Sequence, residues 1–222
     1  MNKKKLSYYI FKSLSEHRLD EIVESLDLIE SGLKNKFQDW GEWYEKKTKG
    51  WSDAEKSDFI DHYYDDLAMV RDTAPNMARQ AICVCISGYF ETFMADLCRY
   101  VYKTKLLPSG PRQKLYLEDS QNYLIDKAGF CEQLFDSQEW KFCIKASYVR
   151  NAIAHYNGRV PNHLQGNLKK QAEIITQFIN NTEGVSVTTI GDILIDIDYC
   201  KLVMKHIKKM TEIFLEAIES DL

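Results

Sequence analysis

Residues 82–98 read ICVCISGYFETFMADLC, and the pattern within this stretch decides the fold. Its apolar residues recur at spacings of three and four in two adjoining stripes, so a helix formed here is apolar around most of its circumference. A helix of that kind belongs at the centre of a protein. Its remaining face carries small residues, which let a neighbouring helix approach closely, and one carboxylate, Glu91.

The central helix is expected to extend from about Pro75 to Lys105, because proline suits a first helical turn. The sequence on either side predicts further helices and one β-like stretch. The expected helices are 16–47, one starting after Ser52 with a capping box to Glu55, 115–129, one starting after Ser137 and ending at Asn157-Gly158, 168–179 and 199–219. Alternating residues in 185–197 predict a small β-hairpin before the last helix. The fold class is therefore all-α.

Composition limits the class of protein. The chain has 222 residues, of which 45% are hydrophobic, so it can bury a core and is not disordered as a whole. Only 10 glycines and 4 prolines occur, which argues against a turn-rich β-barrel or sandwich. The net charge of −4 means that any nucleic-acid contact must be local.

The six cysteines form no C-x-x-C pair, so we expect free and mostly buried thiols. We identify no signal peptide and no apolar run long enough to span a membrane. We therefore expect a cytoplasmic protein with no membrane contact.

Residues 147–158, SYVRNAIAHYNG, carry the groups best suited to chemistry. Asn151 and His155 are four residues apart and therefore lie on one helix face, and Ser147 extends that column by another turn. Arg150 and His155 are five apart, so on a straight helix their directions differ by roughly 140°. Either the helix unwinds near His155, or a second copy of the protein completes the site.

Arg, Asn and His together suit RNA cleavage without a metal. A histidine can take the 2′-hydroxyl proton or deliver one to the leaving oxygen, and an arginine can hold the phosphate with two hydrogen bonds. Asn151 would orient the histidine or the phosphate. The alternative is structural: Arg150 and Asn151 fasten the end of a helix, and His155 is a partly exposed cap.

Arg150, Asn151 and His155 match, residue by residue, the Arg-polar-x-x-x-His form of the R-x4–6-H motif, so the segment resembles the HEPN superfamily. Residues 88–93, GYFETF, resemble the helix that precedes this motif in bacterial members, and the hairpin and last helix fit the family's C-terminal part. The resemblance covers roughly residues 75–220. It divides the chain into an N-terminal helical extension, 1–72, which matches nothing, and a HEPN-like bundle, 73–222.

The resemblance implies an up-and-down helical bundle that dimerises so that two motifs line one cleft. It implies a metal-independent endoribonuclease of the kind found in toxin–antitoxin and antiviral defence systems, with RNA as substrate and an antitoxin or regulatory protein as a further partner. Arg150, Asn151 and His155 would be catalytic and Glu91, Ser147 and Tyr156 supporting, with no metal and no cofactor. Other family members are non-catalytic modules that bind a nucleotide, RNA or a protein.

Some features have two interpretations. Glu91 is either a surface residue or a partner of Arg150 that fixes the direction of its guanidinium. His62 lies in an acidic stretch without a second histidine nearby, so we expect no metal there. Aromatic residues at 40–51 are expected to pack together, but their exposure would favour a third role, a helical scaffold that binds a partner through residues 1–72.

The acidic net charge counts against an RNA substrate, because phosphates need local positive potential. The basic residues near the motif are Arg150, Arg159, Lys145, Lys169 and Lys170.

Overall fold

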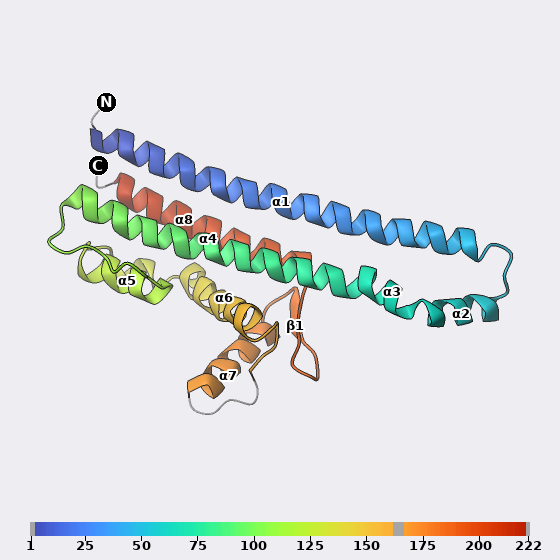
Figure 1. The fold of residues 1–222 in the computed structure, drawn as a ribbon. Helices are drawn as coiled ribbons and strands as arrows, with labels where there is room; N and C mark the ends of the chain where they lie inside the picture. Colours follow the sequence, from blue (N-terminus) through green and yellow to red (C-terminus); the bar gives the residue numbers. More distant parts are fainter. Residues whose placement is uncertain (1–2, 162–166, 221–222) are drawn as a thin grey trace.

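The computed structural model describes residues 3–161 and 167–220 and has the expected all-α architecture with one small hairpin before the last helix (Figure 1). Its elements are α1 (Lys3–Lys47), α2 (Asp53–His62), α3 (Tyr64–Ala68), the π-helical turn η1 (Met69–Thr73), α4 (Ala74–Lys105), α5 (Leu117–Asp126), the 3-10 turn η2 (Glu132–Leu134), α6 (Gln138–His155), α7 (Asn167–Asn180), β1 (Val185–Val187), β2 (Ile193–Ile195) and α8 (Ile197–Glu219). The two strands pair antiparallel, with Ser186 opposite Leu194.

Helix α4 lies at the centre, as its two apolar stripes predict. It packs against α1, α5, α6 and α8 and also contacts β2. Its side chains form the middle of the core, where Phe90 packs edge-on against Trp140 of α6, and Trp140 packs edge-on against Phe214 of α8. Pro75 lies in its first turn, as expected. The position of α4 therefore follows from its own sequence.

Helix α1 begins at Lys3, so the expected start near residue 16 is wrong. The reason is packing between distant parts of the chain. Tyr8 is buried, and its hydroxyl donates hydrogen bonds to the Leu215 carbonyl (3.2 Å) and to Glu219 Oε2 (2.9 Å). Phe11 stacks on both Phe93 and Tyr100 of α4. These contacts with α4 and α8 hold the first turns of α1 against the bundle.

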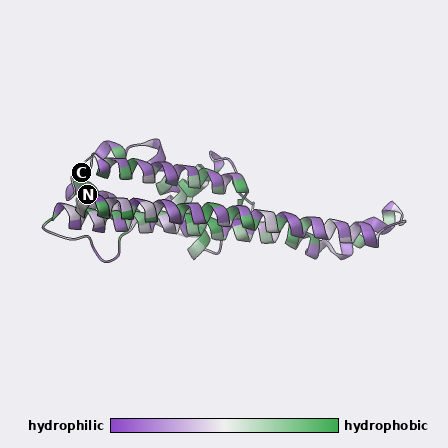
Figure 2. Cartoon of the chain, turned by 90° about the horizontal axis from the view of Figure 1, so that it is seen from above, coloured by the Kyte–Doolittle hydropathy of each residue, from purple (hydrophilic) through white to green (hydrophobic). Residues whose placement is uncertain are grey.

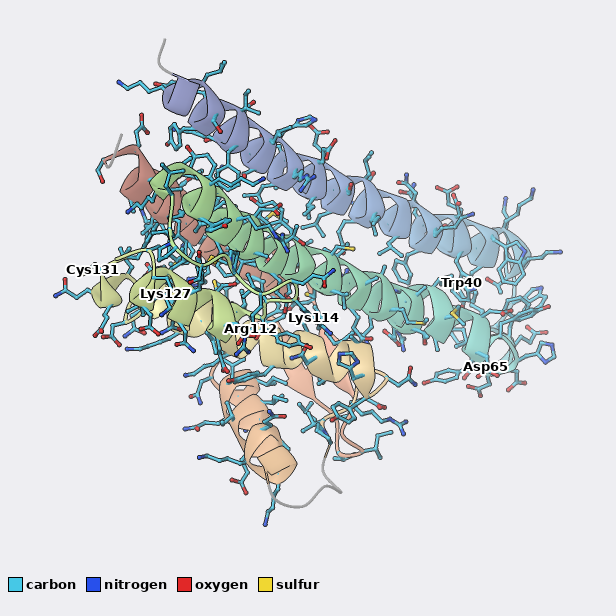
Figure 3. All side chains as sticks on the ribbon, turned by 60° about the vertical axis from the view of Figure 1, so that its left-hand side comes forward. Trp40, Asp65, Arg112, Lys114, Lys127 and Cys131 are labelled. Carbon is cyan, nitrogen blue, oxygen red and sulfur yellow. The ribbon has the colours of Figure 1, made fainter. Side chains whose placement is uncertain are left out.

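The second half of α1, with α2 and α3, extends beyond the other helices as a long arm (Figures 1 and 2). Figure 3 places Trp40 and Asp65 near its outer end. The expected capping box is present: Glu55 N–H donates to Ser52 Oγ (3.4 Å), and Ser52 N–H donates to Glu55 Oε2 (2.8 Å). The expected aromatic packing is also present, and the rings in contact are Trp40, Trp43, Tyr44, Trp51, Phe59 and Tyr63. These rings join the two sides of the arm.

Within the described residues, one helical stretch, Tyr64–Lys105, is long and apolar enough to cross a membrane. This differs from the expectation that the chain has no such segment. The stretch includes the central helix of the bundle, and 56% of its most apolar window is buried. Core helices of soluble proteins pass the same test, so the result is weak evidence for a membrane span.

Gly184, in the turn between α7 and β1, offers a stability test of the fold. Its φ is +78°, and a Cβ there would overlap the side chain of Asp196 and the backbone of Tyr199 at the start of α8. We expect Gly184→Ala to lower the free energy of unfolding by about 1–3 kcal/mol. As a control, Gly41→Ala adds a methyl group to open space on α1 and should raise it by about 0.5–1 kcal/mol. Chemical denaturation measures both, and equal effects would contradict the geometry.

Candidate functional site

Helix α6 carries the motif and begins and ends where the sequence predicts. Ser137 is its N-cap, with Oγ accepting a hydrogen bond from the backbone N–H of Trp140 (3.2 Å). The helix continues through His155. Asn157 and Gly158 then take positive φ values of 54° and 75°, as expected for a helix stop. Unwinding therefore begins only after His155.

The chain after α6 is fastened to the hairpin. The backbone N–H of Ile193 donates to the Gly158 carbonyl (2.8 Å), and that of Val160 donates to the Gly191 carbonyl (2.9 Å). Gln80 of α4 donates to the Ile193 carbonyl (2.8 Å), and Asn76 accepts from the N–H of Ile195 (2.8 Å). Both α4 amides were missed from the sequence, because nothing in their spacing indicates a hairpin more than a hundred residues away.

Arg150 is held by Glu91. Of the two interpretations of Glu91, the structure therefore agrees with the one in which it is a partner of Arg150. The Arg150 guanidinium forms an ion pair with Glu91 Oε1 through Nη2, and the two side chains are only 14% and 26% exposed. Its Nη1 donates to Asn151 Oδ1 (2.9 Å), while Nε is buried without a hydrogen-bond partner among the described residues. Glu91 therefore sets the direction of the guanidinium, and Arg150 in turn holds the Asn151 amide.

The other predicted residues differ in how far their side chains are exposed to solvent. Ser147 is buried, and its Oγ donates to the Ile144 carbonyl (2.7 Å), so it is engaged within its own helix. His155 is exposed in the last turn of α6. Tyr156 is exposed too, and its backbone N–H donates to the Ala152 carbonyl (3.0 Å) as the helix ends. The site thus combines a fixed arginine with an accessible imidazole.

A polar hollow lies along the motif face of α6, and we call it the α5–α6 hollow. Its volume is about 390 Å³. It is lined by Glu91, Tyr116, Leu117, Glu118, Asp119, Ile144, Ser147, Tyr148, Asn151 and Gln171. Three of the six predicted site residues therefore face one space, together with residues of α5 and α7 that the sequence analysis did not select. Arg150, His155 and Tyr156 are not among its lining residues.

Inside this hollow one hydrogen bond links α6 to α5: the Tyr148 hydroxyl donates to Glu118 Oε1 (3.1 Å). Asp119 Oδ2 accepts from the backbone N–H of Tyr116, the residue that caps α5 (3.2 Å). Burial, with Glu118 as a further cause, raises the pKa of Tyr148 above its usual value. Tyr148 therefore remains a neutral hydrogen-bond donor at physiological pH.

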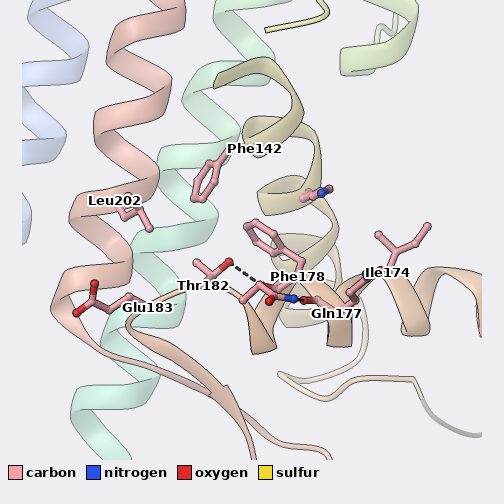
Figure 4. Close-up of a pocket in the computed structure, with 9 residues that line it drawn as sticks. Phe142, Ile174, Gln177, Phe178, Thr182, Glu183 and Leu202 are labelled. Atoms are coloured by element: carbon pink, nitrogen blue, oxygen red, sulfur yellow. Dashed lines mark hydrogen bonds between the residues drawn. The ribbon is translucent and has the colours of Figure 1, made fainter. Parts of the chain in front are cut away.

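A second hollow, of about 430 Å³, lies between α6, α7 and α8 (Figure 4). Phe142, Phe178 and Leu202 form much of its wall, and Phe142 also stacks on His206. None of the predicted site residues lines it. In the described part of the chain, no group of three or more His, Cys, Asp or Glu side chains is placed to hold a metal ion.

Positive charge near the motif is modest. Arg159 is offset by Asp192, whose Oδ1 accepts a hydrogen bond from its Nε (2.6 Å). Lys145 is exposed on α6, and Lys169 and Lys170 are exposed on α7.

Comparisons with known proteins give no assignment: no family model, no curated protein and no solved structure matches the chain.

Proposed function

We propose that this protein is a HEPN-like endoribonuclease that cleaves RNA without a metal ion, acting as a toxin or a defence effector. The observation that carries the proposal is the placement of the motif. Glu91 fixes the Arg150 guanidinium, Arg150 fixes Asn151, and His155 is exposed on the same helix. Cleavage of a phosphodiester by the neighbouring hydroxyl requires two groups: a fixed cation that offsets charge on the phosphate, and an accessible acid–base group that moves the protons.

The proposed reaction uses the RNA's own 2′-hydroxyl. A neutral His155 removes the proton of that hydroxyl, and the oxygen attacks the adjacent phosphorus. The bond from phosphorus to the 5′-oxygen breaks, and that oxygen takes a proton from a protonated His155. The products are a 2′,3′-cyclic phosphate and a free 5′-hydroxyl, so the reaction consumes no water or cofactor. Arg150 offsets the negative charge that builds on the phosphate oxygens.

One copy of the chain does not offer both groups to one phosphate. Because α6 stays helical through His155, Arg150 and His155 keep the roughly 140° difference of a straight helix. We therefore propose a two-fold dimer in which two copies of α6 line one cleft, so that His155 of each copy works with Arg150 of the other.

We expect the purified protein to be a dimer when measured by light scattering at about 20 μM, a concentration at which a stable homodimer remains associated. The reason is that the proposed site is incomplete in one copy. A monomer at this concentration that still cleaves RNA would contradict the shared site.

The experiment for the function is incubation of the purified protein with total RNA in the presence of EDTA, with a DNA pool of similar length in parallel. We expect RNA to be cut and DNA to be resistant, because DNA lacks the attacking hydroxyl. RNA that stays intact in the presence of a folded dimer would favour a non-catalytic module that binds a nucleotide, RNA or a protein.

The arm favours a second candidate function, binding of a regulatory protein or antitoxin. It extends beyond the bundle and exposes the large apolar side chains of Phe37, Trp51 and Tyr64. Exposed apolar side chains that lie together are typical of a surface that binds a protein partner. This candidate is compatible with the first, since the arm and the motif lie on different parts of the fold.

A further inference from the structure

The α5–α6 hollow differs from a phosphate site in its charge. Glu91, Glu118 and Asp119 contribute carboxylates, of which only that of Glu91 is offset by Arg150, and no lysine or arginine is among the described residues that line it. A phosphate placed inside would be repelled by these groups. RNA could place only an uncharged part, such as a base, in this space.

The shape and the side chains of the hollow suit a base. A volume of about 390 Å³ is ample for one nucleobase and its ribose. Tyr116, which is 57% exposed, and Tyr148 contribute aromatic rings, and bases turned out of a single strand commonly stack on such rings. Lys114 lies over the Tyr116 ring, 5.1 Å from its centre, where it can meet the backbone phosphate outside. The hollow therefore combines aromatic rings and a nearby lysine with its carboxylates.

The hydrogen-bonding groups favour one base. Glu118 Oε1 already accepts a bond from Tyr148, which holds the carboxylate in place and leaves Oε2 and the second lone pair of Oε1 to accept from a ligand. A carboxylate matches two adjacent donors, and guanine alone among the RNA bases has two, N1–H and the N2 amino group, side by side on one edge. Asn151 Oδ1 accepts from Arg150, so its Nδ2 can donate to the guanine O6.

We propose that the α5–α6 hollow binds a guanine base of the RNA next to the cut, with Glu118 as the residue that recognises it. This inference rests on the proposed function for its substrate. Ser147 and Asn151 line the hollow, and His155 follows Asn151 by four residues, about 6 Å along the helix. That spacing places a base in the hollow and its neighbouring phosphate near the exposed imidazole.

The test is binding of free nucleosides to the purified wild-type protein, measured by calorimetry. Guanosine should bind at least about tenfold more tightly than inosine, which lacks the N2 amino group, and than uridine. Glu118→Gln should remove this preference, because an amide offers one acceptor where the carboxylate offers two. Glu132→Gln, an exposed change on η2 outside the hollow, is the matched control and should retain it.

Guanosine that fails to bind, or that binds no better than uridine, overturns the inference, and so does a preference that survives Glu118→Gln. Nucleoside binding needs no cleavage, so the guanine site and the proposed ribonuclease activity can be refuted independently of each other. RNA cut without regard to guanine refutes the recognition and leaves the ribonuclease in place. A guanosine preference that depends on Glu118, in a protein that cuts no RNA, supports the binding site and refutes the proposed reaction.

Discussion

His155→Ala is expected to lower the rate of RNA cleavage by about 10²–10⁴-fold, the usual contribution of a positioned proton donor or acceptor. His155 is exposed in the last turn of α6, so its removal should leave the thermal unfolding temperature almost unchanged. The measurement is the initial rate on a defined single-stranded RNA under EDTA, with unfolding followed in parallel. The separation of the two readouts distinguishes a catalytic role from a structural cap.

His17→Ala is the matched control, because His17 is an exposed histidine on α1 that lies 3.3 Å from Glu21 on the same helix. It should leave the rate at the wild-type value. A rate that is also unchanged in His155→Ala would remove the acid–base role and return His155 to the structural interpretation.

Arg150→Lys is expected to lower the cleavage rate by about 10²–10³-fold, the size of effect seen when one transition-state hydrogen-bond donor is removed. An ammonium keeps the charge but cannot reproduce the planar fork that meets Glu91, Asn151 and a phosphate together. Arg99→Lys is the control, because Arg99 pairs with Asp96 on the exposed surface of α4. Steady-state kinetics of both variants provide the comparison.

Glu91→Gln tests the same ion pair from its other side. Because Glu91 positions Arg150 and lies away from the reacting atoms in the proposed mechanism, kcat should fall by about tenfold with little change in KM. Wild-type kcat in Glu91→Gln, or a tenfold loss in Arg99→Lys as well, would mean that the pair has only a structural role.

Much of the fold can be predicted because it depends on local sequence. The apolar stripes of α4, the capping box at Ser52 and the positive-φ stop at Asn157 each follow from a few neighbouring residues. The start of α1 could not be predicted in this way. Tyr8 is held by contacts with Leu215 and Glu219, more than two hundred residues away, and no local pattern indicates such a contact.

The candidate site, like the fold, has one part that can be predicted from local sequence and one part that cannot. Arg150, Asn151 and His155 can be selected from their spacing on one helix, and Glu91 can be named as one possible partner of Arg150, although the sequence leaves a surface position equally open. The α5–α6 hollow could not be predicted, because it forms only where α4, α5, α6 and α7 meet. Glu118 and Gln171 have unremarkable neighbours in the sequence, so packing alone shows their relation to the motif.

The most direct test of the central claim is the chemistry of the cut end. A defined RNA that the protein cleaves is compared with the same RNA carrying a single 2′-deoxy nucleotide at the cut, both in EDTA, and the products are identified by mass spectrometry. The proposed mechanism predicts a 2′,3′-cyclic phosphate from the first RNA and no cleavage at that position in the second. A 3′-hydroxyl product, cleavage that requires a metal ion, or cleavage of the deoxy-substituted RNA at the same bond would contradict it.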